Sequence, residues 1–161
     1  MSNEKFFALL QGEGKALWFL GTLMTVKADG KATNGAFTLI EQVLPPGFAT
    51  PPHIHHADEE AFYLIEGELR GFCGDNSWEA RSGSFIYLPR AVKHGFEVSS
   101  SSPARLLQLT TPAGFEHFAE AMGEPAQSLE LPPPGAPDIP RLLSEAARHN
   151  YEIIVPSNLD R

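Results

Sequence analysis

Short apolar runs that end in turn signals dominate the first two thirds of the chain and restrict what it can fold into. Residues 18–28, 36–44, 61–72, 84–88, 94–98 and 104–110 are rich in aromatic and β-favouring residues. Pairs such as Asp29-Gly30 and Asn34-Gly35, and the tract Pro45-Pro46-Gly47, separate these runs and favour turns. Many short strands of this kind are typical of a β-barrel or β-sandwich.

After Pro112 the pattern becomes helical. Apolar residues recur at the spacing of one helix face at Phe115, Phe118, Ala119 and Met122, and again at Leu142, Leu143, Ala146 and Ala147. A proline-rich linker, 131–140, separates the two predicted helices, and Asp138 is suited to cap the second one. Residues 151–155 are predicted to form a terminal strand or an extended tail. We expect one domain over 1–161, with a barrel at about 12–111 and helices and a tail at about 112–161.

Composition excludes several classes of partner. The 161 residues suit one domain, and the net charge of −8 argues against binding nucleic acid, whose phosphates would be repelled. No run approaches the ~20 apolar residues of a membrane span. The lone cysteine, Cys73, excludes an internal disulfide framework and suits a reducing compartment. We therefore expect a cytoplasmic protein that binds neither nucleic acid nor membranes.

A histidine pair marks the candidate site. In an extended strand side chains alternate, so His53 and His55 point to one side while Ile54 and His56 point to the other. Two such imidazoles can converge on one ion, and Glu60 can return from a short loop as an anionic ligand. Alternation then places Phe62 and Leu64 beside the ion as pocket walls.

A second segment carries the third imidazole. Pro89 ends a predicted strand, a tight turn follows, and His94 begins the next strand, with Phe96 as a further wall residue by alternation. Three neutral nitrogens and one carboxylate suit divalent nickel, manganese, iron or cobalt, with zinc as a further candidate. In an octahedral ion, four protein ligands leave two positions for substrate and for water or dioxygen.

Other polar residues have simpler interpretations. His56 and Glu59 are neighbours of ligands and are expected to be exposed or to support the site. Glu59 is an alternative carboxylate ligand, although its spacing to Gly67 favours it less than Glu60. His117 and His149 lie on the predicted helices and are interpreted as surface or interface residues.

The two segments together resemble the paired motifs of the cupin superfamily. The first motif has Gly, five residues, His-X-His, four residues, Glu, six residues and Gly, which is matched by Gly47, His53, His55, Glu60 and Gly67. The second is matched at Gly83, Pro89 and His94, but Ala91 stands where the family usually has Gly and Val98 where it often has Asn. The resemblance implies a mainly β fold, the cupin double-stranded β-helix or jelly-roll barrel, here with a C-terminal helical extension.

The resemblance extends to bacterial single-domain quercetin 2,3-dioxygenase-type cupins over about 12–155. It rests on Trp18-Phe19-Leu20-Gly21, on 51–56 with 60–63, and on Thr111-Pro112-Ala113-Gly114 before a helix. It implies that a flavonol binds the metal through its 3-hydroxyl oxygen, that Glu60 is both ligand and base, and that cleavage with dioxygen releases carbon monoxide. The alternative is a non-redox metal-binding cupin, either a small-molecule binding or regulatory module or an isomerase. A homodimer is expected, partly from the same resemblance.

Overall fold

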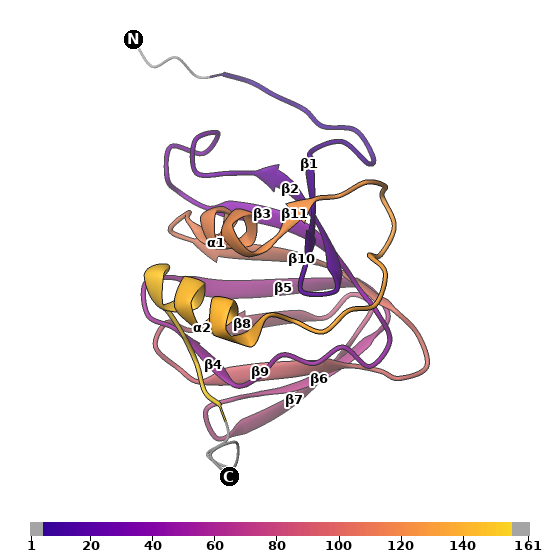
Figure 1. Ribbon diagram of the computed structural model, residues 1–161, viewed down its shortest axis with the longest axis vertical. Coiled ribbons are helices and arrows are strands. Elements are labelled where there is room, and N and C mark those ends of the chain that lie inside the picture. Colours follow the sequence, from indigo (N-terminus) through magenta and orange to yellow (C-terminus); the bar gives the residue numbers. More distant parts are fainter. Residues whose placement is uncertain (1–4, 156–161) are drawn as a thin grey trace.

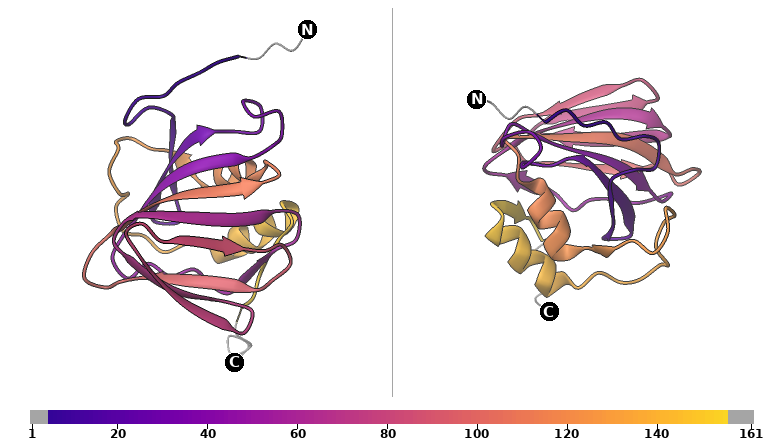
Figure 2. Two further views of the ribbon diagram at one scale, coloured as in Figure 1. Left: turned by 180° about the vertical axis from the view of Figure 1, so that it is seen from behind. Right: turned by 90° about the horizontal axis from the view of Figure 1, so that it is seen from above.

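The computed structural model describes residues 5–155, which form two antiparallel sheets packed face to face with two helices beside them (Figure 1; Figure 2). The larger sheet has the order β11-β1-β2-β3-β10-β5-β8 and the smaller one β12-β4-β9-β6-β7. The strands are β1 (Lys15–Phe19), β2 (Thr22–Ala28), β3 (Thr38–Leu44), β4 (His53–His55), β5 (Glu59–Glu66), β6 (Glu68–Cys73), β7 (Asn76–Arg81), β8 (Phe85–Leu88), β9 (His94–Val98), β10 (Ala104–Thr111), β11 (Glu124–Pro125) and β12 (Tyr151–Ile153). The helices are α1 (Phe115–Met122) and α2 (Ile139–Arg148).

The prediction of a mainly β fold is confirmed, and each of the six predicted runs contains at least part of a strand. In β3 and β10 every second residue is buried, which follows from the pleat because only one face of the sheet meets the interior. The predicted second helix begins as expected: the Asp138 carboxylate accepts the backbone amide of Arg141, and Pro140 lies in the first turn.

The single run predicted over 18–28 is wrong in one respect. The chain reverses at Leu20 and Gly21, whose φ angles are 48° and 81°, so β1 and β2 form a hairpin in which Phe19 pairs with Thr22. Two consecutive left-handed residues are the geometry of a tight two-residue hairpin turn. Leucine is uncommon at such a position, which explains why the turn was not predicted.

The C-terminal part of the chain adds strands to the sheets as well as helices. Of the two alternatives for 151–155, a strand is observed: β12 pairs antiparallel with β4 along its whole length. β11 pairs with β1 at the edge of the larger sheet. Both helices lie on the same side of the molecule, next to these two edges (Figure 2).

Two apolar clusters hold these elements together. One lies between the sheets and contains Leu44, Phe62, Leu64, Leu69, Ala80, Leu88, Phe96, Val98, Ala104 and Leu106. The other joins the helices to the larger sheet and contains Leu17, Phe19, Met24, Val26, Ile40, Phe115, Phe118, Ala119, Leu142, Ala146 and Tyr151. Among the helices of residues 5–155, none has both the length and the apolar character needed to cross a membrane.

Candidate metal centre

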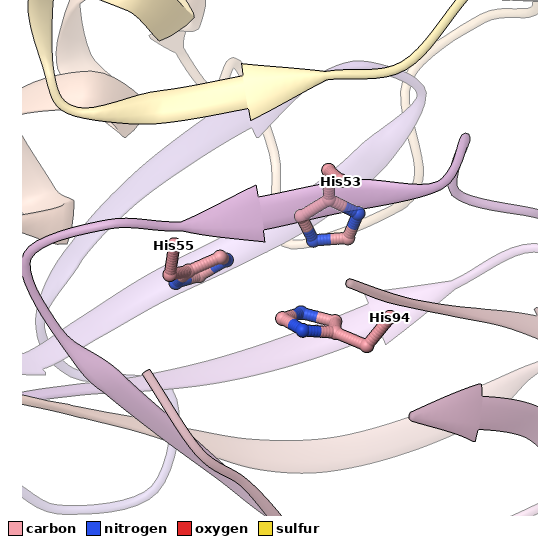
Figure 3. Close-up of side chains that lie close together, drawn as sticks. All are labelled: His53, His55 and His94. Atoms are coloured by element: carbon pink, nitrogen blue, oxygen red, sulfur yellow. The ribbon is translucent and has the colours of Figure 1, made fainter. Parts of the chain in front are cut away.

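Three histidines from two neighbouring strands converge. His53 and His55 lie on β4, and His94 begins β9 directly opposite His53 in the ladder. One ring nitrogen from each lies within 4.8 Å of the others, and Figure 3 shows the three rings turned toward a common point. Alternation along β4 produces this arrangement, because residues two apart share a face of the strand.

Hydrogen bonding fixes which nitrogen of each ring is free. Nδ1 of His53 donates to the Pro51 carbonyl at 2.8 Å, and Nδ1 of His94 donates to the Val92 carbonyl at 3.1 Å. Nδ1 of His55 donates to the Asp58 carboxylate at 2.6 Å. Each acceptor can only accept, so all three Nδ1 atoms carry the proton and the Nε2 atom of each ring is the one that could coordinate an ion.

The environment of the Nε2 atom of His94 indicates that the three Nε2 atoms could hold a metal ion. It is buried, in a side chain that is only 1% exposed, and it has no hydrogen-bond partner among the described residues. A buried polar nitrogen without a partner carries a desolvation cost that a metal ion would remove. The donor set, three neutral imidazoles, is a common one for divalent transition metals.

Glu60 reaches the cluster from the opposite sheet. It lies on β5, and its Oε2 atom is 3.1 Å from Nε2 of His55. Two ligand atoms at right angles around one ion, each about 2.1 Å from it, are about 3.0 Å apart, so this separation suits joint coordination. The Gln108 amide donates to the same Oε2 at 3.2 Å, and the Gln42 amide donates to Gln108.

Burial and neighbouring charges shift the four groups in different directions. Burial, together with His55, lowers the pKa of His53 to about 4, and burial with the two other imidazoles lowers the pKa of His94 to about 3. Burial acts in the same direction on His55, but Glu60 and Asp58 outweigh it and its pKa is raised. Burial raises the pKa of Glu60. His53 and His94 are therefore neutral, as metal ligands must be.

A cavity of about 640 Å³ opens beside these residues. His53, His55 and Glu60 line it together with Phe62 and Phe96. Phe62 and Phe96 meet edge to face with ring centroids 5.3 Å apart. The rest of its wall is largely apolar and includes Met24, Phe48, Phe115, Phe118 and Tyr151, and the linker 132–138 lies along it.

Leu64 lies elsewhere than the sequence suggested. It is 1% exposed, packs within the apolar cluster between the sheets, and is not among the residues that line the cavity. It shares the inward face of β5 with Glu60 and Phe62, as alternation requires. The cavity ends before the strand does, so the shared face does not bring Leu64 to the wall.

The remaining sequence candidates lie outside the cluster. His56 faces away from it and meets Glu152, with Nε2 and Oε2 2.8 Å apart, while Glu59 forms an ion pair with Arg90 at 2.7 Å. His117 is exposed, and His149 donates to the carbonyl of Glu145. Glu60 is thus the one of the two adjacent carboxylates that faces the histidines.

Four residues that support the site were not predicted. Gln42 and Gln108 occupy inward positions of strands whose other inward residues are apolar or threonine, and a glutamine at such a position is a sequence signal that could have found them. Asp58 comes just before β5, and Tyr151 lies on β12. Tyr151 carries no local signal, because its contact with Asp58 crosses the fold, whereas Asp58 lies only three residues from His55.

Comparison with known proteins finds similarity over parts of this chain. Residues 40–112 match the family model described as a cupin domain. Quercetin 2,3-dioxygenase of Bacillus subtilis (strain 168) is 26% identical over 134 residues, which are 83% of this chain and 40% of the relative. An uncharacterized protein of Methanocaldococcus jannaschii is 29% identical over 75 residues, 47% of this chain and 60% of that protein. The chain thus spans about half the length of these curated relatives.

Solved structures show the same fold. The polyketide cyclase RemF from Streptomyces resistomycificus superposes with a TM-score of 0.61 at 20% identity, covering 96% of this chain and 89% of the cyclase. An RmlC-like cupin from Shewanella frigidimarina has a TM-score of 0.58 at 17% identity, covering 70% of this chain and 96% of that one. Residues 40–112 thus match a cupin domain, and they lie inside a fold that cupins of known structure share.

Proposed function

We propose that this chain is a metal-dependent dioxygenase that cleaves a flavonol, or a related enolic aromatic compound, with dioxygen. The observation that carries the proposal is the placement of His53, His55 and Glu60 in the wall of an aromatic-lined cavity of about 640 Å³, with His94 beside them. The 26% identity to a quercetin 2,3-dioxygenase over 83% of the chain supports it.

The four proposed ligands are His53, His55, Glu60 and His94, and the proposed ion is divalent nickel, manganese, iron, cobalt or zinc. When bound, such an ion acts as a Lewis acid and lowers the pKa of a substrate hydroxyl group. His53 and His94 contribute neutral imidazoles whose orientation is fixed by the Pro51 and Val92 carbonyls.

Glu60 is the proposed base. Its carboxylate is 4% exposed and borders the cavity, so a substrate hydroxyl that enters there comes within reach of it. Burial raises the pKa of Glu60, which favours acceptance of the hydroxyl proton. Gln108 holds the carboxylate in place by donating to Oε2 at 3.2 Å.

The aromatic walls select the shape of the substrate and exclude water. Phe96 contacts both Phe62 and Phe48, with ring centroids 5.3 and 6.1 Å apart, and these rings form one side of the cavity. A flat aromatic substrate can pack against such rings in offset or edge-to-face geometry. A dry pocket would also protect reactive intermediates from hydrolysis.

Oxygen uptake with quercetin tests the proposal. The chain is stripped of metal and reloaded separately with nickel, manganese, cobalt, iron and zinc, and bound metal is quantified in each sample. We expect oxygen consumption with carbon monoxide release in at least one loaded sample. Glu60→Gln should lower turnover by about 100-fold or more, whereas the adjacent Glu59→Gln, which faces Arg90, should leave it unchanged.

The opposite outcome favours the second candidate function. If every sample holds stoichiometric metal and none consumes oxygen, flavonol cleavage is rejected. A non-redox cupin, either an isomerase or a small-molecule binding module, then accounts better for the site, because proton transfer by Glu60 requires no oxidant.

We also propose that the chain forms a homodimer through the outer face of β5 and β8. On that face Tyr63 pairs with Phe85, and their exposed fractions are 48% and 64%; Tyr87, next to them, is 56% exposed. β8 is the last strand of its sheet, so its outer edge has no strand partner within residues 5–155.

A cytoplasmic location stays a prediction.

A further inference from the structure

The C-terminal strand holds the strand that carries two of the histidines. β4 is three residues long, and its ladder with β9 contains one pair, His53 with His94. On its other side β12 pairs with all of β4, and Tyr151 lies opposite His55. Two backbone bonds continue this ladder: His56 N–H donates to Asn150 O, and Ile154 N–H donates to Pro52 O, both at 2.9 Å.

Tyr151 also reaches the site through its side chain. Its hydroxyl donates to Oδ2 of Asp58 at 2.7 Å, while Oδ1 of Asp58 accepts Nδ1–H of His55 at 2.6 Å. The Tyr151 ring lies 4.6 Å from the His55 ring and packs against Phe115 and Phe118. All three members of the chain Tyr151–Asp58–His55 are nine-tenths or more buried.

His55 differs from the other two histidines in the group that accepts its Nδ1 proton. The Nδ1 atoms of His53 and His94 donate to carbonyls two residues away in their own segments. Nδ1 of His55 instead donates to a carboxylate whose second oxygen is held by a residue 93 positions later in the chain. Partners that fix the ring orientation of metal-ligating histidines commonly change metal affinity 10- to 100-fold when removed.

From these contacts we propose that the C-terminal strand is part of the metal centre, with Asp58 and Tyr151 as positioning residues that set the tautomer and orientation of His55. This inference rests on the metal site of the proposed function, although it does not depend on the reaction or the substrate. It predicts that metal affinity is sensitive to a hydroxyl group on β12 that contacts no metal ligand by hydrogen bond.

The full-length chain and Co²⁺ provide the test. The dissociation constant is measured by chelator competition, and the visible absorption spectrum of the bound ion reports its ligand geometry. Tyr151→Phe removes only the hydroxyl, and we expect Co²⁺ binding to weaken about 10-fold with a shifted spectrum. Asp58→Asn should weaken binding more strongly. Tyr63→Phe, at an exposed tyrosine on the outer face of β5, is the matched control and should change neither quantity.

The outcomes separate this inference from the proposed function. Wild-type chain that binds no Co²⁺ would reject the metal centre itself. Equal affinity and an identical spectrum in wild type and Tyr151→Phe, even with a lower melting temperature, would assign Tyr151 a purely structural role and overturn the inference. If the wild type shows no dioxygenase activity but Tyr151→Phe and Asp58→Asn still weaken metal binding, the inference is upheld and the proposed function is not.

A measurement on wild-type protein covers the case in which the variants fail to fold. Because coupling between two sites is reciprocal, saturation with Co²⁺ should slow hydrogen exchange at the amide of Ile154, which bonds to β4's flank at Pro52. Exchange in residues 150–155 that is the same with and without Co²⁺ would overturn the inference.

Discussion

His94 connects the sequence motif to the chemistry at the scale of a single residue. Its Nε2 atom is buried and has no hydrogen-bond partner within residues 5–155, so a bound ion would satisfy it, and removing the imidazole breaks no hydrogen bond of Nε2 in the metal-free protein. We expect His94→Ala to weaken Ni²⁺ or Co²⁺ binding by about 100-fold or more, which calorimetric titration would detect.

The matched control for that variant is His117→Ala. The side chain of His117 is 69% exposed and lies on α1, away from the cluster, so its loss should leave metal affinity unchanged. Equal affinities for wild type and His94→Ala would remove His94 from the ligand set.

Local geometry decides which site residues could be predicted. His53 and His55 point to one side because side chains alternate along a strand, and His94 follows a turn that Pro89 indicates. Alternation also placed Phe62 and Phe96 at the cavity, but it could not show that the cavity stops short of Leu64. Periodicity specifies a direction for each side chain, whereas the extent of a cavity depends on how the two sheets pack.

At the scale of elements, Glu116 fixes the start of α1. It is 3% exposed, and its carboxylate accepts the backbone amides of Gly30 at 2.7 Å and Gly114 at 2.9 Å as well as the hydroxyl of Thr38. Burial alone would raise the pKa of Glu116, but these hydrogen bonds outweigh it and the pKa is lowered. One side chain thus joins α1 to β3 and to the loop after β2.

Glu116→Gln should therefore destabilise the protein by about 2 kcal/mol at pH 7, because the charge-assisted hydrogen bonds are lost. A carboxylate with a lowered folded pKa stabilises the protein fully above its unfolded pKa of about 4.3, and the stabilisation is lost as the pH falls through the folded pKa. Urea unfolding at a series of pH values should show the difference between wild type and variant shrinking below about pH 4.

Glu120→Gln on the same helix is the control for that series. Glu120 is an exposed partner of Lys15 at 3.0 Å, and such surface pairs contribute at most about 1 kcal/mol. A wild-type advantage over Glu116→Gln that stays constant from pH 7 to pH 3 would contradict the assigned role of the carboxylate.

Elements were predictable where a turn residue or a cap marks their ends. The Asp138 cap and the glycines between strands are such marks, and the second helix begins where Asp138 indicated. The hairpin at Leu20 was missed because a leucine gave no turn signal, and tertiary pairing determined the reversal. β12 was left open between strand and tail, since its partner, β4, lies about a hundred residues earlier.

At the scale of the whole molecule, the candidate metal centre connects the two sheets. Its histidines come from the five-stranded sheet and Glu60 from the seven-stranded sheet, while β12 brings the C-terminal end of the described chain to the same point. A barrel or sandwich was predictable from the many short strands and their turn signals, but which strands meet at the site follows from the topology.

The outer face of the larger sheet provides the last prediction, which concerns assembly. Phe85 and Tyr87 project outward from an edge strand, and exposed apolar side chains beside an unpaired sheet edge favour association with another chain. A second copy fits because a two-fold axis brings the same patch of both chains together. Phe85→Lys should therefore convert a dimer into a monomer in light scattering at micromolar concentration, whereas Leu129→Lys, at another exposed apolar residue, should not. A monomeric mass for the wild type would reject the homodimer.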